Sequence, residues 1–218
     1  MKTIIADFDG TLAPIRLNPN QVKMSQAMRK TLLKLHLNGF EVIVLSSRPL
    51  DFLKSRLPSF VKIISSRGNT IKVKKTQVNK IYKHLKITLK HFPVRIKEKK
   101  IGIVAHYRTL PENKVEDLEE FLRSYCELFN LQFIRGRKAV EITPKNVQDK
   151  IETARKLANS NTIFFGDDDS DAQAAFQVIL KGGTAYLVKT KERHYTPPQV
   201  KLLTGITQVR KTLQKLTR

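Results

Sequence analysis

Two aspartates separated by one residue stand near the start of the chain, within the run Asp7-Phe8-Asp9-Gly10-Thr11-Leu12. The short apolar run before them, Ile4-Ile5-Ala6, predicts a buried strand that carries both acids at its carboxyl end. Side chains two positions apart on a strand point the same way, so Asp7 can attack a phosphorus atom while Asp9 faces the departing oxygen. Gly10 lets the chain turn sharply beside a ligand. The competing interpretation is a strand that simply ends in an acidic turn.

A second acidic group follows another apolar run, in the sequence Gly166-Asp167-Asp168-Asp169-Ser170-Asp171. Four carboxylates within five positions would repel one another without a counter-ion. Capping of the following helix by Asp169 or Ser170 is the ordinary explanation, but it accounts for one acid and not four. Carboxylate oxygens are hard ligands that suit Mg²⁺, which keeps several waters and shares substrate phosphate. The two acidic stretches together predict a magnesium site.

A pair of serines and an arginine, Ser46-Ser47-Arg48, end a third apolar run at residues 40–45. Hydroxyl and backbone N–H groups at a strand-to-helix turn can bind phosphate oxygens. Capping of the next helix is the commoner use of such a serine. The stretch becomes a candidate phosphate-binding turn only in combination with the two acidic stretches.

Apolar runs and helical stripes alternate along most of the chain. The runs predict strands at residues 2–8, 40–45, 61–64, 162–165 and 184–188, and the stripes predict helices at residues 25–37, 50–57, 78–92, 147–157, 172–179 and 206–216. Strands separated by helices imply βαβ units, a parallel sheet and the α/β class. Right-handed crossovers bring the strand ends to one edge of the sheet, where ligands bind.

The alternation breaks between residues 94 and 143. This part reads as extended chain over residues 94–108, a helix over 112–129, and short strands at 131–134 and 139–142. Two strands, a helix and two strands make a compact α+β unit. The sequence therefore predicts an inserted cap domain at residues 94–143, with residues 1–93 and 144–218 as the core.

The chain is strongly basic, with a formal net charge of +22 over 218 residues. Such a field attracts anions, including phosphate esters, nucleic acid and acidic lipid surfaces, although a solvated lysine-rich surface is the plainer explanation. One cysteine, Cys126, allows no internal disulfide, and no stretch approaches the roughly 20 apolar residues of a membrane span. We expect a cytoplasmic monomer that acts on a small molecule and has no membrane partner.

The three stretches, in this order, resemble the haloacid dehalogenase (HAD) superfamily of phosphohydrolases. Within it the chain looks like the trehalose-6-phosphate phosphatase family, on the segments DFDGTLAPI from Asp7, HYR from His106, RKAVEITP from Arg137 and GDDDSDAQAAF from Gly166. The resemblance covers nearly the whole chain. It implies a Rossmann-like, doubly wound parallel-sheet core with a smaller inserted cap.

The resemblance also implies roles for the acids. Asp7 would be the nucleophile, and Asp9 would protonate the leaving oxygen and then take a proton from water. Mg²⁺ would be held by Asp7, the backbone carbonyl of Asp9, and Asp167. Asp168 and Asp171 would contact these ligands without binding the ion themselves. Hydrolysis would then pass through an aspartyl-phosphate intermediate, as in other two-step covalent mechanisms.

The phosphate and the sugar need further contacts. Ser46, Ser47 and a lysine would bind phosphate, but the family's lysine falls on Asp149 in an ungapped alignment. A helix turns by about 100° per residue, so a shift of one residue matters unless the preceding loop is one residue longer. We expect Lys150 to bind the phosphate, with Lys145 as the alternative. The remaining substrate contacts implied by the resemblance are Arg48, His106, Arg108, Lys138 and Glu141.

Trehalose 6-phosphate is the substrate that the resemblance favours. The chain departs from the family at Arg67 and Thr143, which leaves room for sucrose phosphate or for the phosphates of mannosyl- or glucosylglycerate. A different class of function is binding of nucleic acid or another anionic surface. Its support is the basic run from Lys72 to Arg108, in which Glu98 is the only acid.

Overall fold

The computed structural model describes residues 1–65, 75–99, 102–136, 138–145 and 150–217, with only the backbone at residues 75–77. Arg67 and Asp149, two positions where the chain departs from the expected family pattern, lie outside these residues. The chain forms two compact units, Met1–Asn69 with Asp149–Arg218 and Thr70–Gln148. Each unit has its own sheet and its own apolar core, so the predicted combination of an α/β unit and an α+β unit is confirmed.

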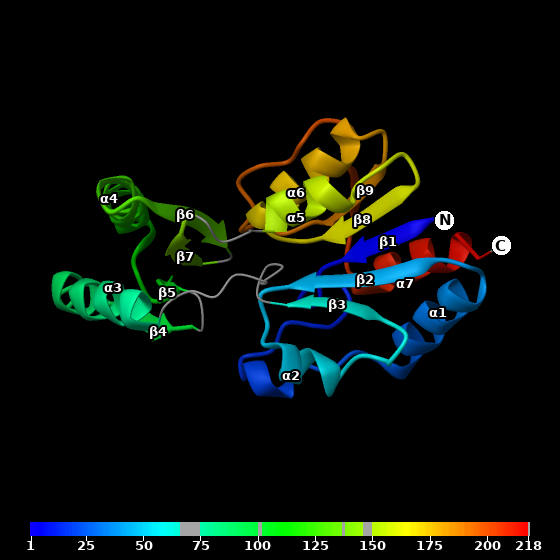
Figure 1. Cartoon of the computed structure of the whole chain (residues 1–218), viewed down its shortest axis with the longest axis horizontal. Coiled ribbons are helices and arrows are strands. Elements are labelled where there is room, and N and C mark those ends of the chain that lie inside the picture. Colours follow the sequence, from blue (N-terminus) through cyan, green and yellow to red (C-terminus); the bar gives the residue numbers. More distant parts are fainter. Residues whose placement is uncertain (66–74, 100–101, 137, 146–149, 218) are drawn as a thin grey trace. The chain divides into compact units, whose positions relative to one another are not determined.

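The larger unit is built on a parallel sheet with the order β10-β9-β8-β1-β2-β3 (Figure 1). Its strands are β1 (Thr3–Ala6), β2 (Glu41–Ser46), β3 (Lys62–Ser65), β8 (Thr162–Gly166), β9 (Thr184–Val188) and β10 (Lys201–Leu203). Every pairing between neighbours is parallel. The edge strand β10 was missed by the sequence analysis, because three residues are too few to show an apolar period.

The order of the strands along the sheet reverses at β1, which is therefore the topological switch point. Ala6, the last residue of β1, pairs with Val44 of β2 on one side and with Phe165 of β8 on the other. From β1 the chain continues outward through β2 and β3, whereas β8, β9 and β10 extend to the opposite edge. A ligand site is expected outside the carboxyl ends of strands at such a switch point. Both acidic stretches begin there.

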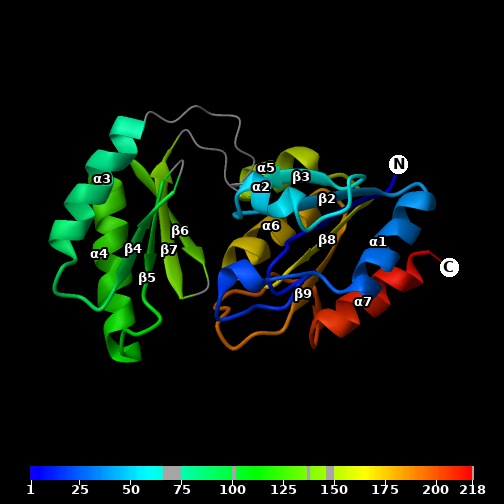
Figure 2. The same cartoon turned by 90° about the horizontal axis from the view of Figure 1, so that it is seen from below.

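Helices cover both faces of this sheet (Figures 1 and 2). Alternate residues of each strand enter two separate cores, since Ile4 and Val44 join one cluster and Ile5 and Ile43 the other. The first core also takes residues of α1 (Gln26–Leu37), α2 (Leu50–Lys54) and α7 (Ile206–Lys215), and the second takes residues of α5 (Lys150–Leu157) and α6 (Asp169–Leu180). A near-continuous apolar run is what a strand buried on both faces requires.

The smaller unit has an antiparallel sheet with the order β4-β5-β7-β6 and helices on one face. Its elements are α3 (Lys75–Thr88), β4 (Arg95–Glu98), β5 (Ile103–His106), η2 (Glu112–Lys114), α4 (Val115–Leu128), β6 (Leu131–Gly136) and β7 (Ala139–Pro144). It is larger than the predicted insert of residues 94–143. The apolar stripe of α3 (Val78, Ile81, Leu85) packs into this unit's core, on the other side of the predicted boundary at residue 94.

Two smaller observations complete the description. A short 3₁₀ helix, η1 (Pro19–Gln21), is capped by the side chain of Asn18, and α2 ends at Lys54, earlier than its apolar stripe suggested. Within the described residues, none of the helices combines the length and the apolar character that crossing a membrane demands.

Candidate active site

Asp7 lies directly after β1, with only 7% of its surface exposed. Its backbone N–H donates to the carbonyl of Phe165 on β8 (2.9 Å), which continues the sheet pairing past the end of β1. Asp9 is more open, its side chain 27% exposed. Gly10 has φ +84°, and a Cβ atom there would clash with Oδ2 of Asp167. The close approach expected beside Gly10 is therefore made by the second acidic stretch.

In that second stretch, at the start of α6, the acids have distinct partners. Asp168 is the N-cap, because its Oδ1 accepts from the backbone N–H of Asp171 (2.8 Å). In return Oδ2 of Asp171 accepts from the N–H groups of Asp167 (3.1 Å) and Asp168 (3.3 Å). The cap is thus Asp168, not Asp169 or Ser170 as expected. The misassignment arose because α6 begins at Asp169, three residues before the apolar stripe that starts at Ala172.

Lys150, at the first turn of α5, connects the two acidic stretches. Its Nζ lies 2.8 Å from Oδ1 of Asp7 and 2.7 Å from Oδ1 of Asp171, and the side chain is buried. Lys145, the alternative lysine, stands exposed at the end of the smaller unit's sheet. Of the two candidates, the structure brings Lys150 to the acids. A buried ammonium is tolerated because both carboxylates hydrogen-bond to it.

Burial dominates the electrostatics of these groups. It raises the pKa of Asp7 well above its ordinary value, with Lys150 opposing and the neighbouring acids adding to the rise. It raises the pKa of Asp167 in the same way, and that of Asp171 to about 6. Burial lowers the pKa of Lys150, but Asp171 and Asp7 outweigh this effect and raise it above the usual range. The single ammonium of Lys150 is therefore not enough to balance the negative charge of the three buried carboxylates.

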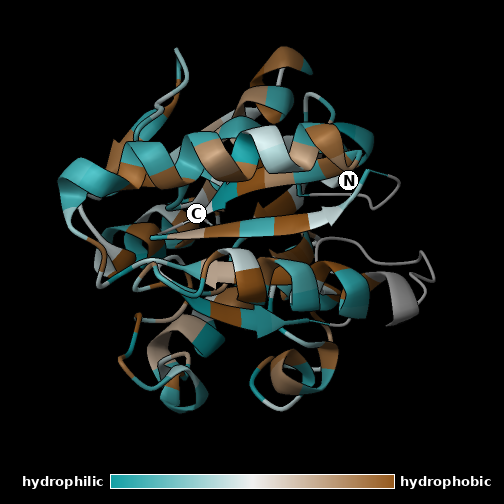
Figure 3. Ribbon diagram, turned by 90° about the vertical axis from the view of Figure 1, so that its left-hand side faces the viewer, coloured by the Kyte–Doolittle hydropathy of each residue, from teal (hydrophilic) through white to brown (hydrophobic). Residues whose placement is uncertain are grey.

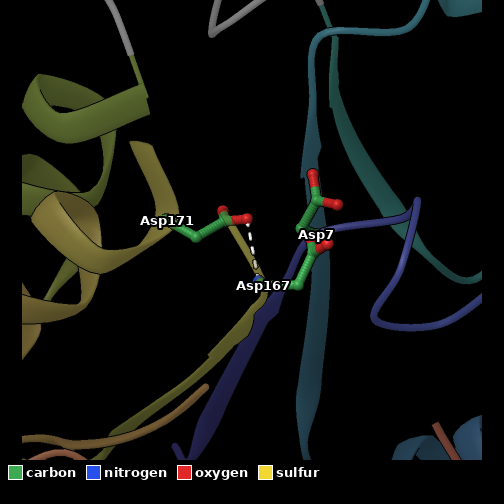
Figure 4. A group of neighbouring side chains, drawn as sticks. All are labelled: Asp7, Asp167 and Asp171. Carbon is green, nitrogen blue, oxygen red and sulfur yellow. Dashed lines mark hydrogen bonds between the residues drawn. The ribbon is translucent and has the colours of Figure 1, made fainter. Parts of the chain in front are cut away.

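Three of the acids are close enough to share a cation (Figure 4). One carboxylate oxygen from each of Asp7, Asp167 and Asp171 lies within 4.8 Å of the others. Both oxygens of Asp171 accept hydrogen bonds, Oδ1 from Lys150 and Oδ2 from the backbone N–H of Asp167. An all-oxygen donor set with excess negative charge is what Mg²⁺ requires. The donor chemistry of this site fits that ion.

Ser46 is the last residue of β2, and Ser47 and Arg48 follow it. The Arg48 guanidinium forms a two-point ion pair with Asp9, from Nε (2.8 Å) and Nη2 (2.6 Å), and stacks on Phe52 with 4.6 Å to the ring centroid. Ser46 is buried, and its Oγ accepts from the N–H of Arg48 (3.3 Å). Arg48 was expected to contact substrate, whereas here its partner is Asp9.

Arg193 was missed by the sequence analysis. It follows β9, and its Nη1 donates to the backbone carbonyls of Asp167 (3.1 Å) and Val188 (2.6 Å). Nearby, Oδ1 of Asp169 accepts from the N–H groups of His194 (2.8 Å) and Tyr195 (3.0 Å). The segment after β9 is thereby tied to the acidic stretch at two points. No motif surrounds Arg193, so no sequence signal would have found it.

The remaining expected contacts belong to the smaller unit. His106 and Glu141 lie on one face of its sheet, since His106 pairs with Ala139 and Glu141 is two positions further along β7. Burial, together with Lys97, Lys99, Arg108 and Arg95, lowers the pKa of His106 to about 4. Glu141 pairs with Lys99 (3.3 Å), and Lys138 with Glu112 (3.6 Å). Arg108 is exposed in the turn after β5.

The fold is shared with solved HAD-like hydrolases. The Candida albicans trehalose-6-phosphate phosphatase C-terminal domain superposes with a TM-score of 0.77 at 18% identity, covering 99% of this chain and 92% of that one. A HAD-like hydrolase from Bacillus subtilis gives 0.70 at 14% identity, covering 99% and 100%. At these identities the likeness shows the fold, a HAD-like core with a separate cap unit, as the sequence predicted.

Curated relatives carry the comparison further. The probable trehalose-phosphate phosphatase E of Arabidopsis thaliana is 29% identical over 84% of this chain and 61% of its own length. The trehalose-6-phosphate phosphatase-related protein of Thermoplasma acidophilum is 21% identical, over 80% and 81%. The chain thus spans about three-fifths of the plant relative. The family described as trehalose-phosphatase matches residues 5–201, a span that takes in both acidic stretches and Lys150, and the chain belongs to that family.

Proposed function

We propose that this chain hydrolyses a sugar phosphate with Mg²⁺, and that trehalose 6-phosphate is its substrate. The observation that carries the proposal is the convergence of Asp7, Asp167 and Lys150 in a member of the trehalose-phosphatase family. A buried carboxylate held between an ammonium and a cation site is suited to approach an anionic phosphate.

Asp7 and Asp9 would share the chemistry in two steps. In the first, a carboxylate oxygen of Asp7 bonds to phosphorus as the bond from phosphorus to the sugar oxygen breaks, and Asp9 gives that oxygen a proton. In the second, water attacks the phosphorus of the aspartyl-phosphate and Asp9 takes its proton, while the bond from phosphorus to the Asp7 oxygen breaks, which frees phosphate and restores the Asp7 carboxylate. Lys150 would offset negative charge on the phosphoryl oxygens throughout.

The metal would be held by Asp7, Asp167 and the backbone carbonyl of Asp9. Mg²⁺ in that place supplies positive charge to the transferring phosphoryl group. Asp168 and Asp171 would orient this site through the hydrogen bonds that link them to each other and to Asp167. Ser46 and Ser47 would bind the phosphate at the end of β2.

The smaller unit would act as a cap that recognises the sugar. Its candidate contacts are polar groups suited to hydroxyls, on the sheet face of His106 and in the turns at its edges: His106, Arg108, Lys138 and Glu141. A His106 imidazole with a pKa of about 4 is neutral near pH 7 and can both donate and accept hydrogen bonds. Sucrose phosphate and the phosphoglycerate sugars remain the alternative substrates.

The decisive experiment is phosphate release from a panel that contains trehalose 6-phosphate, sucrose 6-phosphate, and mannosyl- and glucosyl-3-phosphoglycerate. We expect release from trehalose 6-phosphate in Mg²⁺ and none with a chelator. Asp7→Asn should abolish turnover, while Asp51→Asn, which neutralises an exposed acid on α2, should leave it unchanged.

Calorimetric titration of Mg²⁺ into the same variants separates metal binding from turnover. Asp167→Asn should weaken Mg²⁺ binding, and Asp51→Asn should not. Activity retained by Asp7→Asn would refute the assignment of Asp7 as the nucleophile. If no member of the panel released phosphate, the proposed sugar-phosphatase function would be refuted. The alternative of nucleic-acid binding stays a prediction, which a mobility shift on mixed oligonucleotides at low salt tests.

A further inference from the structure

The helical face of the smaller unit exposes large apolar side chains. On α3 and α4, and directly after α4, the exposed fractions are 68% for Ile87, 36% for Phe121, 79% for Leu128 and 47% for Phe129. Figure 3 views the molecule from the side of these helices, and brown apolar stretches interrupt the teal along both. Contiguous apolar surface rimmed by polar groups marks an interaction site.

Phe121 and Phe129 lie on one seam between the helices, and Ile87 and Leu128 stand one helical turn after His84 and Tyr125, the two residues that join it. His84 of α3 hydrogen-bonds to the Tyr125 hydroxyl of α4 (2.9 Å) and lies edge-on to Phe129 (5.5 Å between ring centroids). Phe121 stands one helical turn before Tyr125, and their rings are 6.3 Å apart. The seam is therefore a strip of aromatic side chains, of which Phe121 and Phe129 are exposed to solvent.

The two helices beside the seam carry opposite charges. The exposed ionic residues of α3 whose side chains are described are three lysines, Lys80, Lys83 and Lys86. Those of α4 are four acids and one arginine: Glu116, Asp117, Glu120, Glu127 and Arg123. No ion pair among the described residues joins a lysine of α3 to an acid of α4. The face is thus half basic and half acidic, and each half lacks its complement.

We infer that this face docks a second copy of the chain through a two-fold axis that runs along the seam. Such an axis carries α3 of one copy over α4 of the other, so that basic meets acidic twice and the aromatic strips face each other. A two-fold interface uses the same patch on both copies and must be complementary to itself. An axis across the helices would instead set α3 on α3, which like charges oppose.

The charge pattern also selects the partner. An acidic membrane or a nucleic acid would meet repulsion from α4, and a basic partner would meet it from α3. Both helices are complemented only by a surface that places negative charge opposite α3 and positive charge opposite α4. The chain's own face has that arrangement. The inference differs from the monomer expected from the sequence, and the experiment below decides between the two.

One cross-pair can be named. Because His84 contacts Tyr125 and Phe129, its neighbour Lys83 is level along the seam with Glu127, which lies between those two residues. Rotation about the seam preserves that level. Lys83 of each copy is then opposite Glu127 of the other, and the pair occurs twice in the dimer.

Sedimentation equilibrium of the full chain over the micromolar range tests the inference. We expect a wild-type species of twice the 25.0 kDa chain mass. Leu128→Glu should weaken the dimer by more than about tenfold, because it places charge in the apolar strip. The matched control is Leu17→Glu, at an apolar residue 99% exposed in the larger unit, and it should change nothing.

Charge reversal tests the orientation. Lys83→Glu and Glu127→Lys should each weaken the dimer several-fold, and the double variant should restore it, whereas Lys34→Glu on α1 should have no effect. A wild-type chain that stays monomeric, or a dimer indifferent to Leu128→Glu, overturns the inference. Single reversals that the double variant fails to rescue overturn the stated axis. Circular dichroism melting confirms that each variant is folded, and none of these residues belongs to the proposed active site.

Discussion

Lys150 Nζ lies 2.8 Å from Oδ1 of Asp7, although 143 positions separate the two residues in the chain. The same ammonium holds Asp171, so one buried cation links the end of β1 and the first turn of α6 to α5. Loss of this charge should leave two buried acids without their shared counter-charge.

We therefore expect Lys150→Met to lower kcat by about 10²–10³-fold, the usual effect of removing one electrostatic stabiliser of a transition state. The variant should also unfold at lower temperature, because breaking a buried ion pair is costly. Steady-state kinetics and calorimetry measure the two effects. Lys145→Met is the control, and a larger loss in that variant would show that Lys145 is the phosphate-binding lysine.

Arg48 holds both oxygens of Asp9 and should therefore set the orientation of the proposed acid and base. We expect Arg48→Lys to reduce kcat by about tenfold with little change in KM, since lysine cannot reproduce the two-point contact. Arg56→Lys is a close control, because Arg56 stacks on the same Phe52 ring (4.2 Å) without touching Asp9. Equal losses in the two variants would trace the effect to the ring packing instead.

Arg193 supports Asp167 by donating a hydrogen bond from Nη1 to its backbone carbonyl. Groups that orient metal ligands in this indirect way typically change metal affinity by about 10–100-fold when removed. We expect a loss of this size in the Mg²⁺ affinity of Arg193→Ala, measured by calorimetric titration. Lys191→Ala, at an exposed neighbour, should bind Mg²⁺ like the wild type. If Arg193→Ala bound Mg²⁺ as tightly as the wild type, the role of Arg193 would be confined to fixing the segment that follows β9.

His106 should make stability depend on pH. Burial and four neighbouring cations lower its pKa from 6.5 to about 4 in the folded chain. Between these values the unfolded chain binds a proton that the folded chain does not, so His106 costs stability as the pH falls through this window. We expect the melting temperature of the wild type to drop more than that of His106→Asn between pH 7 and pH 4. Parallel curves for the two proteins would contradict this assignment.

Much of the fold follows from local patterns. Runs such as Ile4-Ile5-Ala6 and Ile163-Phe164-Phe165 are apolar throughout, as strands buried on both faces require, and the helices between them dictate a parallel sheet. The assignment failed where the pattern was short or ambiguous. The three-residue β10 has no readable period, and the stripe of α3 says that the helix is buried on one side but not which core buries it.

The sequence by itself determined the acids of the proposed active site, because a dense group of carboxylates at the ends of buried strands is too costly to desolvate without a cation beside it. Only the tertiary structure decided which cations stand there. A helix rotates by about 100° per residue, so the spacing could not distinguish Lys150 from its neighbours until α5 was placed against β1. Arg193 reaches a backbone carbonyl, which every residue has, and such a contact leaves no trace in the residue types.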